Sequence, residues 1–192
     1  MNKIIWPLLL CAVLCGCGGA EAETGNAVQE QYRTLETARL EAEVTSHTST
    51  DSRTFTLLCS YDADGDAVTT VTAPSELAGL TAVVSGADMT LSSEGLQLPA
   101  GASLDICPAN CLPYLLRALA DGYVLEQSSE ALDDTPCLRL ALDTTAPGGG
   151  KVLCAVWLDA EGLFPRYAEF SRNEQVVLTV KLLAFTCTTS EG

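Results

Sequence analysis

Basic residues and histidine are scarce in this chain of 192 residues. Ten Lys and Arg stand against 25 Asp and Glu, and the formal net charge is −15. A chain with this negative charge does not attract nucleic acid or anionic lipid headgroups. Both are therefore excluded as partners recognised by charge. The single histidine, His47, lies near Ser46 and Ser49, and the chain has no Gly-x-Ser-x-Gly turn of the kind that presents a serine nucleophile. We therefore expect no enzymatic activity.

Patterns typical of metal and cofactor sites are also missing. The nine cysteines form no Cys-x-x-Cys pair, which a structural zinc site would use. Asp62, Asp64 and Asp66 have the spacing of a calcium loop, but Gly65 is fourth instead of sixth and Ala73 holds the twelfth position in place of Glu. A hairpin turn is the expected structure there, with a weak calcium site of another type as the alternative. We predict no metal and no cofactor.

The N-terminus reads as a secretion signal. Lys3 precedes an apolar run over residues 4–14, and a polar, acidic segment begins soon after. The run ends in Leu14-Cys15-Gly16-Cys17, which resembles the lipobox of bacterial lipoproteins. The resemblance implies cleavage after Gly16, so that residues 1–16 are the signal peptide, and a diacylglyceryl group on Cys17. The alternative is an ordinary secreted protein cleaved near Ala20 or Ala22.

Cleavage after Gly16 would leave a membrane-anchored chain of residues 17–192. The mature chain would then have nine Lys and Arg and 25 Asp and Glu, a formal charge of −16. The lipid on Cys17, and not a basic patch, would therefore hold the protein at the membrane. We predict a tether over residues 17–25 and one domain over residues 26–192. The location would be the extracytoplasmic face of the cell membrane, or the outer membrane in a Gram-negative cell, since Gly18 replaces the aspartate that signals inner-membrane retention.

Six cysteines remain in the mature chain. An even number outside the cytoplasm allows three disulfides with 15 connectivities that the sequence does not separate. Buried thiols are the alternative, because cysteine packs as a small apolar residue. Both readings stay open for Cys59, Cys107, Cys111, Cys137, Cys154 and Cys187.

Hydrophobic periodicity predicts two helices and about eleven strands. One helix begins at Asn26 with Val28 and Tyr32 on its apolar stripe, and another covers residues 110–121 and stops at Gly122. Segments of period two predict strands over residues 38–47, 53–61, 67–72, 81–84, 89–92, 96–98, 122–127, 137–144, 151–159, 166–171 and 174–186. Turns are short, so we expect an antiparallel meander.

A sheet of so many strands twists and curls. The predicted fold class is therefore α+β, a curved antiparallel half-barrel with the helices on its concave side. The space between sheet and helices is the natural ligand cavity. We predict that its lining includes Leu57, Val71, Leu91, Leu140, Trp157 and Val180. Trp157 and Tyr123 are the aromatic residues that would line a cleft, with a place in the core as the alternative.

Several segments resemble a known family. They are Tyr32–Leu35 running into Glu41–Val44, Pro74–Gly79 before a strand, Met89–Leu91 with Gly95-Leu96, and Trp157–Asp159 with Leu163–Pro165 before a final strand pair that ends at Phe185. The order of these elements, from about Val28 to Phe185, is similar to the LolA/LolB-type lipoprotein-carrier fold. Its relatives include the mycobacterial LppX/LprG lipoproteins and GerS-like spore-germination lipoproteins. The resemblance implies a curved eleven-stranded sheet and an apolar cavity that receives acyl chains in carriers.

Two functions remain open at this point. The first is a non-catalytic, membrane-anchored lipoprotein that binds a hydrophobic lipid or acyl ligand in the half-barrel cavity. The second, which the GerS-like resemblance implies, is a protein-binding scaffold that recruits or regulates an envelope partner such as a cell-wall enzyme. A lipoprotein shuttle must be soluble, so the anchor predicted at Cys17 departs from that role.

Overall fold

The computed structural model describes residues 18–102, 105–146 and 148–190. The predicted signal peptide and Cys17, the predicted site of acylation, lie outside the described residues. Among those described, no helix has the length and apolar character needed to cross a membrane.

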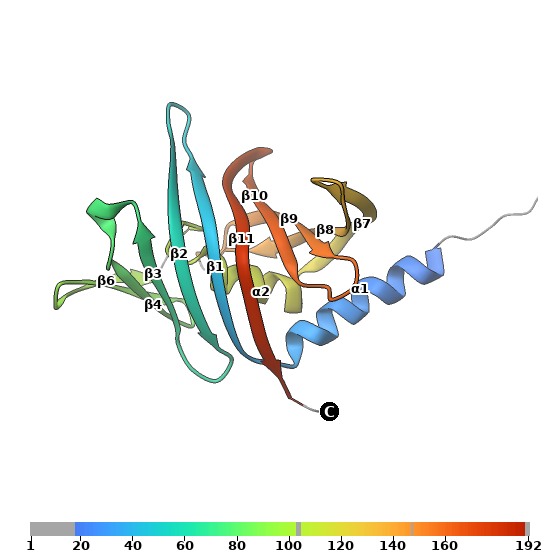
Figure 1. Ribbon diagram of the computed structural model, residues 1–192, viewed down its shortest axis with the longest axis horizontal. Helices are drawn as coiled ribbons and strands as arrows, with labels where there is room; N and C mark the ends of the chain where they lie inside the picture. The colour runs from blue at the N-terminus through green and yellow to red at the C-terminus, as the bar shows by residue number, and fades with distance from the viewer. Residues whose placement is uncertain (1–17, 103–104, 147, 191–192) are drawn as a thin grey trace, which may run out of the picture.

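Eleven antiparallel strands form one open, curved sheet (Figure 1). Each strand was predicted from its alternation, and the structure mainly lengthens them by a few residues. The strands are β1 (Leu35–His47), β2 (Ser52–Asp62), β3 (Ala67–Ala73), β4 (Thr81–Ser85), β5 (Asp88–Ser93), β6 (Leu96–Ala102), β7 (Tyr123–Leu132), β8 (Thr135–Thr145), β9 (Lys151–Asp159), β10 (Pro165–Arg172) and β11 (Gln175–Thr189).

The order of the strands corrects the prediction of one continuous meander. It runs β6-β5-β4-β3-β2-β1-β11-β10-β9-β8-β7, so two meanders spread outward from a central pair, β1 and β11. Leu40 pairs with Phe185 and Val44 with Val180. These two strands are the longest in the sheet, so pairing them joins the two most extended apolar faces. The edges of the sheet are β6 and β7.

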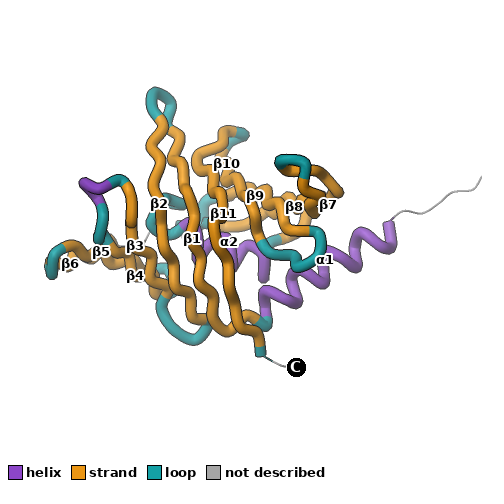
Figure 2. The backbone as a smooth tube through the Cα atoms, viewed as in Figure 1, coloured by secondary structure: helices purple, strands orange, loops and turns teal. Residues whose placement is uncertain are grey.

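Both α-helices lie on the concave side of the sheet (Figure 2). They are α1 (Gly18–Arg33) and α2 (Cys111–Asp121), and a short 3-10 helix, η1 (Ser75–Leu77), joins β3 to β4. Residues 18–25, where the sequence predicted a tether, form the first part of α1, and Asn26 lies inside this helix instead of capping it. Residues 20–23 are Ala-Glu-Ala-Glu, and both residue types favour helix. Gly25 is buried against β7, where a Cβ would come within 3.1 Å of Gln127 Oε1.

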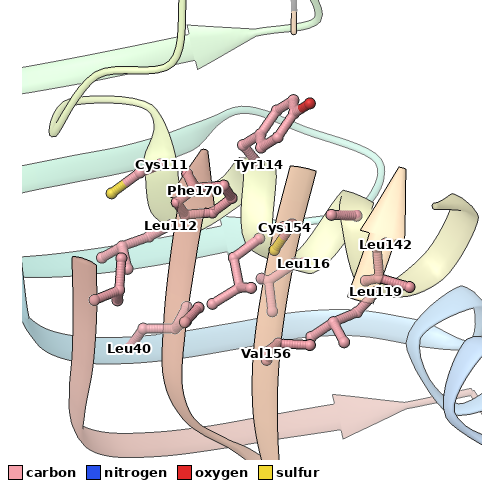
Figure 3. Close-up of a cluster of buried hydrophobic side chains, with 14 of the residues drawn as sticks. Leu40, Cys111, Leu112, Tyr114, Leu116, Leu119, Leu142, Cys154, Val156 and Phe170 are labelled. Carbon is pink, nitrogen blue, oxygen red and sulfur yellow. The ribbon is translucent and has the colours of Figure 1, made fainter. Parts of the chain in front are cut away.

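The second helix fills the space under the centre and the β7 side of the sheet. Nine of its 11 residues are buried, and its leucines point at inward side chains of β1, β8, β9 and β10 (Figure 3). Tyr114 packs edge-on against Phe170 with ring centroids 5.8 Å apart. The sequence predicted this helix correctly, from its cap residue Asn110 to Gly122. This half of the concave face is therefore a packed core.

A bulge in β11 changes which residues face inward. Glu41 pairs with Ala184, but the next residue, Ala42, pairs with Leu182, so Leu183 is the extra residue. Beyond it the inward positions are Phe185 and Cys187, which pack on the core. Ala184 therefore lies on the other side of the sheet from Phe185 and Cys187, because the bulge reverses the alternation.

Candidate binding surface on the concave face

One row of paired residues runs from the core to the far edge of the sheet. Cys59 pairs with Thr69, Thr69 with Ala82, Ala82 with Leu91, and Leu91 with Leu98. Residues that face each other across antiparallel strands lie on the same side of the sheet. Cys59 is fully buried in the main core, so the whole row lies on the concave face. At the end of the row, Leu98 is 69% exposed.

Two more apolar side chains share this part of the concave face. Val71 pairs with the buried Leu57, and Leu96 lies two residues before Leu98 and therefore on the same side. Leu96 is 73% exposed, whereas Val71 and Leu91 are partly buried. We call Val71, Leu91, Leu96 and Leu98 the inner shelf. Neither α2 nor α1 reaches over β5 and β6 in Figures 1 and 2.

The lower part of the same half-sheet is covered by a loop. Ala67, Ala82, Val84 and Met89 form a second, smaller cluster of buried residues, and Cys107 and Ala109 of the loop before α2 pack against it. Leu91 also contacts this cluster. The inner shelf therefore begins where the cover from the loop ends.

The six residues predicted for a cavity do not come together. Leu57, Leu140 and Val180 are at most 1% exposed and belong to the packed core. Val71 and Leu91 lie on the concave face, on the inner shelf. Sequence reasoning missed Leu96 and Leu98 as site residues, although the short apolar alternation over residues 96–98 places both on one face.

Trp157 lies on the opposite, convex face, which corrects its prediction as a cavity residue. Its neighbours Val156 and Leu158 point inward and are fully buried. The indole packs against Tyr167 with centroids 5.4 Å apart, and the Arg139 guanidinium lies 5.3 Å from the ring centre. The indole Nε1 donates a hydrogen bond of 2.9 Å to Glu130. β9 is apolar on both sides, so its alternation does not reveal which face is inward.

Tyr123, the other aromatic residue considered for a cleft, is exposed at the start of edge strand β7. It lines a surface groove of about 540 Å³ with Tyr114 and Arg117 of α2. The Tyr114 hydroxyl and the Thr144 hydroxyl are 2.7 Å apart, and Arg117 Nη1 donates to the Gly86 carbonyl at 2.9 Å. The polar groups of this groove thus bond mainly to the protein itself.

The buried cysteines lie in environments that disfavour a nucleophilic thiolate. Burial raises the pKa of the Cys59 thiol to about 11, and burial likewise raises the pKa of Cys111 and of Cys154. The nucleophile of cysteine chemistry is the thiolate, which these environments disfavour. Cys59, Cys111, Cys137 and Cys154 are buried thiols, as one of the two readings of the sequence expected.

His47 is held at the end of β1 by two hydroxyl groups. Its Nδ1 lies 3.1 Å from Ser52 Oγ and its Nε2 lies 3.2 Å from Thr179 Oγ1. A catalytic histidine of the serine-hydrolase type needs a carboxylate on one ring nitrogen. The two contacts link the end of β1 to β2 and β11.

The acidic turn after β2 is a hairpin turn, as predicted. The Asp62 carboxylate accepts a hydrogen bond of 3.0 Å from the backbone N–H of Asp64. Within residues 18–102, 105–146 and 148–190, no cluster of three or more His, Cys, Asp or Glu side chains is arranged to hold a metal ion.

Comparisons with known proteins bear on the fold. No model of a protein family matches the chain, and no curated protein matches it. A DUF1329 family protein from Desulfovibrio piger is 12% identical, with a TM-score of 0.52 over 90% of this chain and 95% of that one. An uncharacterized conserved protein from Thermus thermophilus is 9% identical, with a TM-score of 0.52 over 88% and 89%.

A LolA superfamily protein from Nitrosomonas europaea is also similar, at 13% identity and a TM-score of 0.46 over 89% of this chain and 94% of that one. At such identities the likeness concerns the fold alone. The predicted fold class, a curved antiparallel sheet with helices on its concave side, is confirmed at that level.

Proposed function

We propose that this chain is a non-catalytic lipoprotein of the bacterial cell envelope that binds a protein partner on its inner shelf. The observation that carries the proposal is the row from Cys59 to Leu98, which begins in the packed core and ends in an exposed leucine on the concave face. Exposed apolar side chains that gather on one concave surface are typical of interaction sites.

A protein partner suits the shelf better than a ligand enclosed in a cavity. Small-molecule sites bury most of the ligand surface. Under the centre of this sheet, however, the side chains of α2 occupy the space, and the shelf at the edge is open. One side of a lipid chain bound to the shelf would stay exposed to water. A protein segment would shield its apolar side chains from water with the rest of its own structure.

The leucine side chains, more than the backbone, would carry the binding. β6 is an edge strand, and an added strand would need its outward N–H groups. Pro99 in the middle of β6 has no N–H, which is a common way to blunt a sheet edge. The partner therefore does not need to extend the sheet as a regular twelfth strand.

The shelf lies far from the proposed anchor. The N-terminal end of α1 is at one end of the longest axis of the molecule, and β6 is at the other end (Figure 1). Gly18, the first residue of α1, follows Cys17 directly. With Cys17 acylated, the inner shelf would face the space outside the membrane, where an envelope protein such as a cell-wall enzyme could reach it.

The proposal is tested by affinity isolation from membranes after mild cross-linking. The double variant Leu96→Ser/Leu98→Ser removes the exposed part of the shelf, and Leu183→Ser removes an exposed leucine of β11 as the matched control. One protein recovered in defined stoichiometry with the wild type and the control, but not with the double variant, supports the proposal. Equal recovery with all three contradicts it.

A second candidate is a lipid or acyl ligand, which the partly buried Val71 and Leu91 on the concave face favour. Mass spectrometry of protein purified from membranes and then heated to release its ligand tests it. A stoichiometric lipid that is absent from a Leu91→Asp variant would support this candidate over the protein partner.

A further inference from the structure

Strands β3 to β6, which carry the inner shelf, contain no basic residue. Residues 54–116 contain seven Asp and Glu but no Lys, Arg or His. This stretch runs from β2 through β6 to the first turns of α2, so the topology gathers it into one side of the molecule. The remaining cations belong to α1, β1, the start of β2, the later part of α2 and the strands β8 to β11, together with Lys3 of the predicted signal.

Few cations from elsewhere reach this side. Asp105 forms an ion pair with Arg172, and Arg117 donates to the Gly86 carbonyl at the turn between β4 and β5. The other ion pairs among the described residues lie outside residues 54–116. Six exposed carboxylates of the stretch thus take part in none of these ion pairs: Asp62, Asp64, Asp66, Glu76, Asp88 and Glu94.

Two of these carboxylates lie at the end of the sheet where the shelf is most exposed. Glu94 is in the tight turn that joins β5 to β6, two residues before Leu96. Both Glu94 and Gly95 have positive φ angles, 49° and 84°, as the commonest hairpin turn requires. Glu76 is in η1, at the same ends of β3 and β4. Exposed leucines and carboxylates without an ion pair therefore lie at the same end of the sheet.

We infer that the partner segment is both apolar and basic, with large apolar side chains for the inner shelf and Lys or Arg for Glu76 and Glu94. The inference rests on the proposed function and narrows the chemistry of its partner. Charge complementarity mainly guides association and excludes wrong partners, while buried apolar contacts supply affinity. An acidic segment would be repelled, and so would a second copy of this chain.

Three synthetic peptides test this chemistry. Each alternates leucine with one polar residue, which is Lys, Gln or Glu, and each carries one fluorescent label for anisotropy measurements on residues 18–192. We expect the Leu-Lys peptide to bind about tenfold more tightly than the Leu-Gln peptide at about 50 mM salt, with a smaller advantage at about 300 mM. The Leu-Glu peptide should not bind.

Variants separate the apolar and the charged contributions. Glu76→Gln/Glu94→Gln should weaken the Leu-Lys peptide severalfold and leave the Leu-Gln peptide unchanged. The matched control Glu41→Gln/Glu43→Gln removes two exposed carboxylates of β1 and should change neither affinity by as much. Leu96→Ser/Leu98→Ser should weaken both peptides.

Each outcome decides a different point. Equal binding of the Lys and Gln peptides, lost in the leucine variant, would overturn the inference on charge and leave the proposed function intact. The inference would also be overturned if the Leu-Lys peptide bound the leucine variant as tightly as the wild type, or if the two carboxylate variants weakened its binding equally. Either result would show general attraction to an acidic protein. No binding by any peptide would count against both.

Discussion

Leu91 of β5 and Leu98 of β6 are paired across these two antiparallel strands, and the boundary between the buried interior and the exposed surface falls between them. Leu91 is partly buried against a small cluster of core residues, whereas Leu98 is 69% exposed on the same concave face. In most sheets with one covered face, inward residues are buried along their whole row. Here the packing against the concave face reaches β5 but not the edge strand β6, which leaves the inner shelf exposed.

Core and shelf leucines should respond differently to truncation. Leu140 is fully buried under α2, so Leu140→Ala should lower the free energy of unfolding by about 2–5 kcal/mol. Leu98→Ala, a chemically identical change on the shelf, should alter it by less than about 0.5 kcal/mol. Denaturant titration of both variants checks this. Similar losses would mean that the shelf is part of the stabilising core.

Gly122 should not tolerate a side chain. It ends α2 and begins the turn into β7, and a Cβ there would overlap the Ala118 carbonyl oxygen and approach Leu142 Cβ to 3.2 Å. Because both neighbours are fixed in the core, Gly122→Ala should destabilise the protein by about 1–3 kcal/mol, as overpacking does. Gly86→Ala is a useful comparison, since its Cβ would meet no atom within 4 Å and only its positive φ of 60° opposes the change. Thermal unfolding that ranks Gly86→Ala as far worse would contradict this account.

Trp157 is a reporter of the convex face. It is the sole tryptophan left after the predicted cleavage, since the other, Trp6, lies in the signal peptide. Its ring is held by Arg139 and Tyr167 away from the shelf. Peptides that bind the shelf should leave its emission spectrum unchanged, whereas Arg139→Met should shift it. A spectral change on peptide binding that persists in Leu96→Ser/Leu98→Ser would place the contact on the convex face.

Stability should fall in acid partly through Asp159. The backbone N–H groups of Gly162 and Glu161 donate to its carboxylate and lower its pKa, with a smaller contribution from Arg166. A carboxyl with a lowered folded pKa stabilises the fold above its unfolded pKa of about 3.9, and this stabilisation is lost as the pH falls through the folded pKa. Asp159→Asn should therefore flatten the decline of unfolding free energy below about pH 4. An unchanged slope would show that this turn does not contribute.

Local patterns predicted the elements well because most strands have an alternation of apolar and polar residues that can be recognised without knowing their partners. Residues 151–159 became β9 without change, and residues 110–121 became α2 to within one residue. The pairing of β1 with β11 could not be predicted, because it joins segments about 140 residues apart and depends on where α2 carries the chain.

The candidate site was predicted less well, for two physical reasons. Trp157 lies in a strand with apolar residues on both faces, so periodicity could not assign its side. Leu183 forms a bulge that reverses the alternation of β11, and no residue type marks it. Val71 and Leu91 lie on the concave face, and in β5 the other side carries the polar residues Asp88, Thr90 and Ser92, so its alternation reveals the inward face.

The most direct test of the central claim is site-specific photo-cross-linking in native membranes. A photoreactive residue at position 98 is compared with one at position 183, which replaces another exposed leucine, on β11, with 52% of its surface accessible. The account predicts one dominant protein adduct from position 98 and little or none from position 183. Adducts of equal yield from both positions, or a lipid adduct alone from position 98, would contradict the claim that the inner shelf binds a protein.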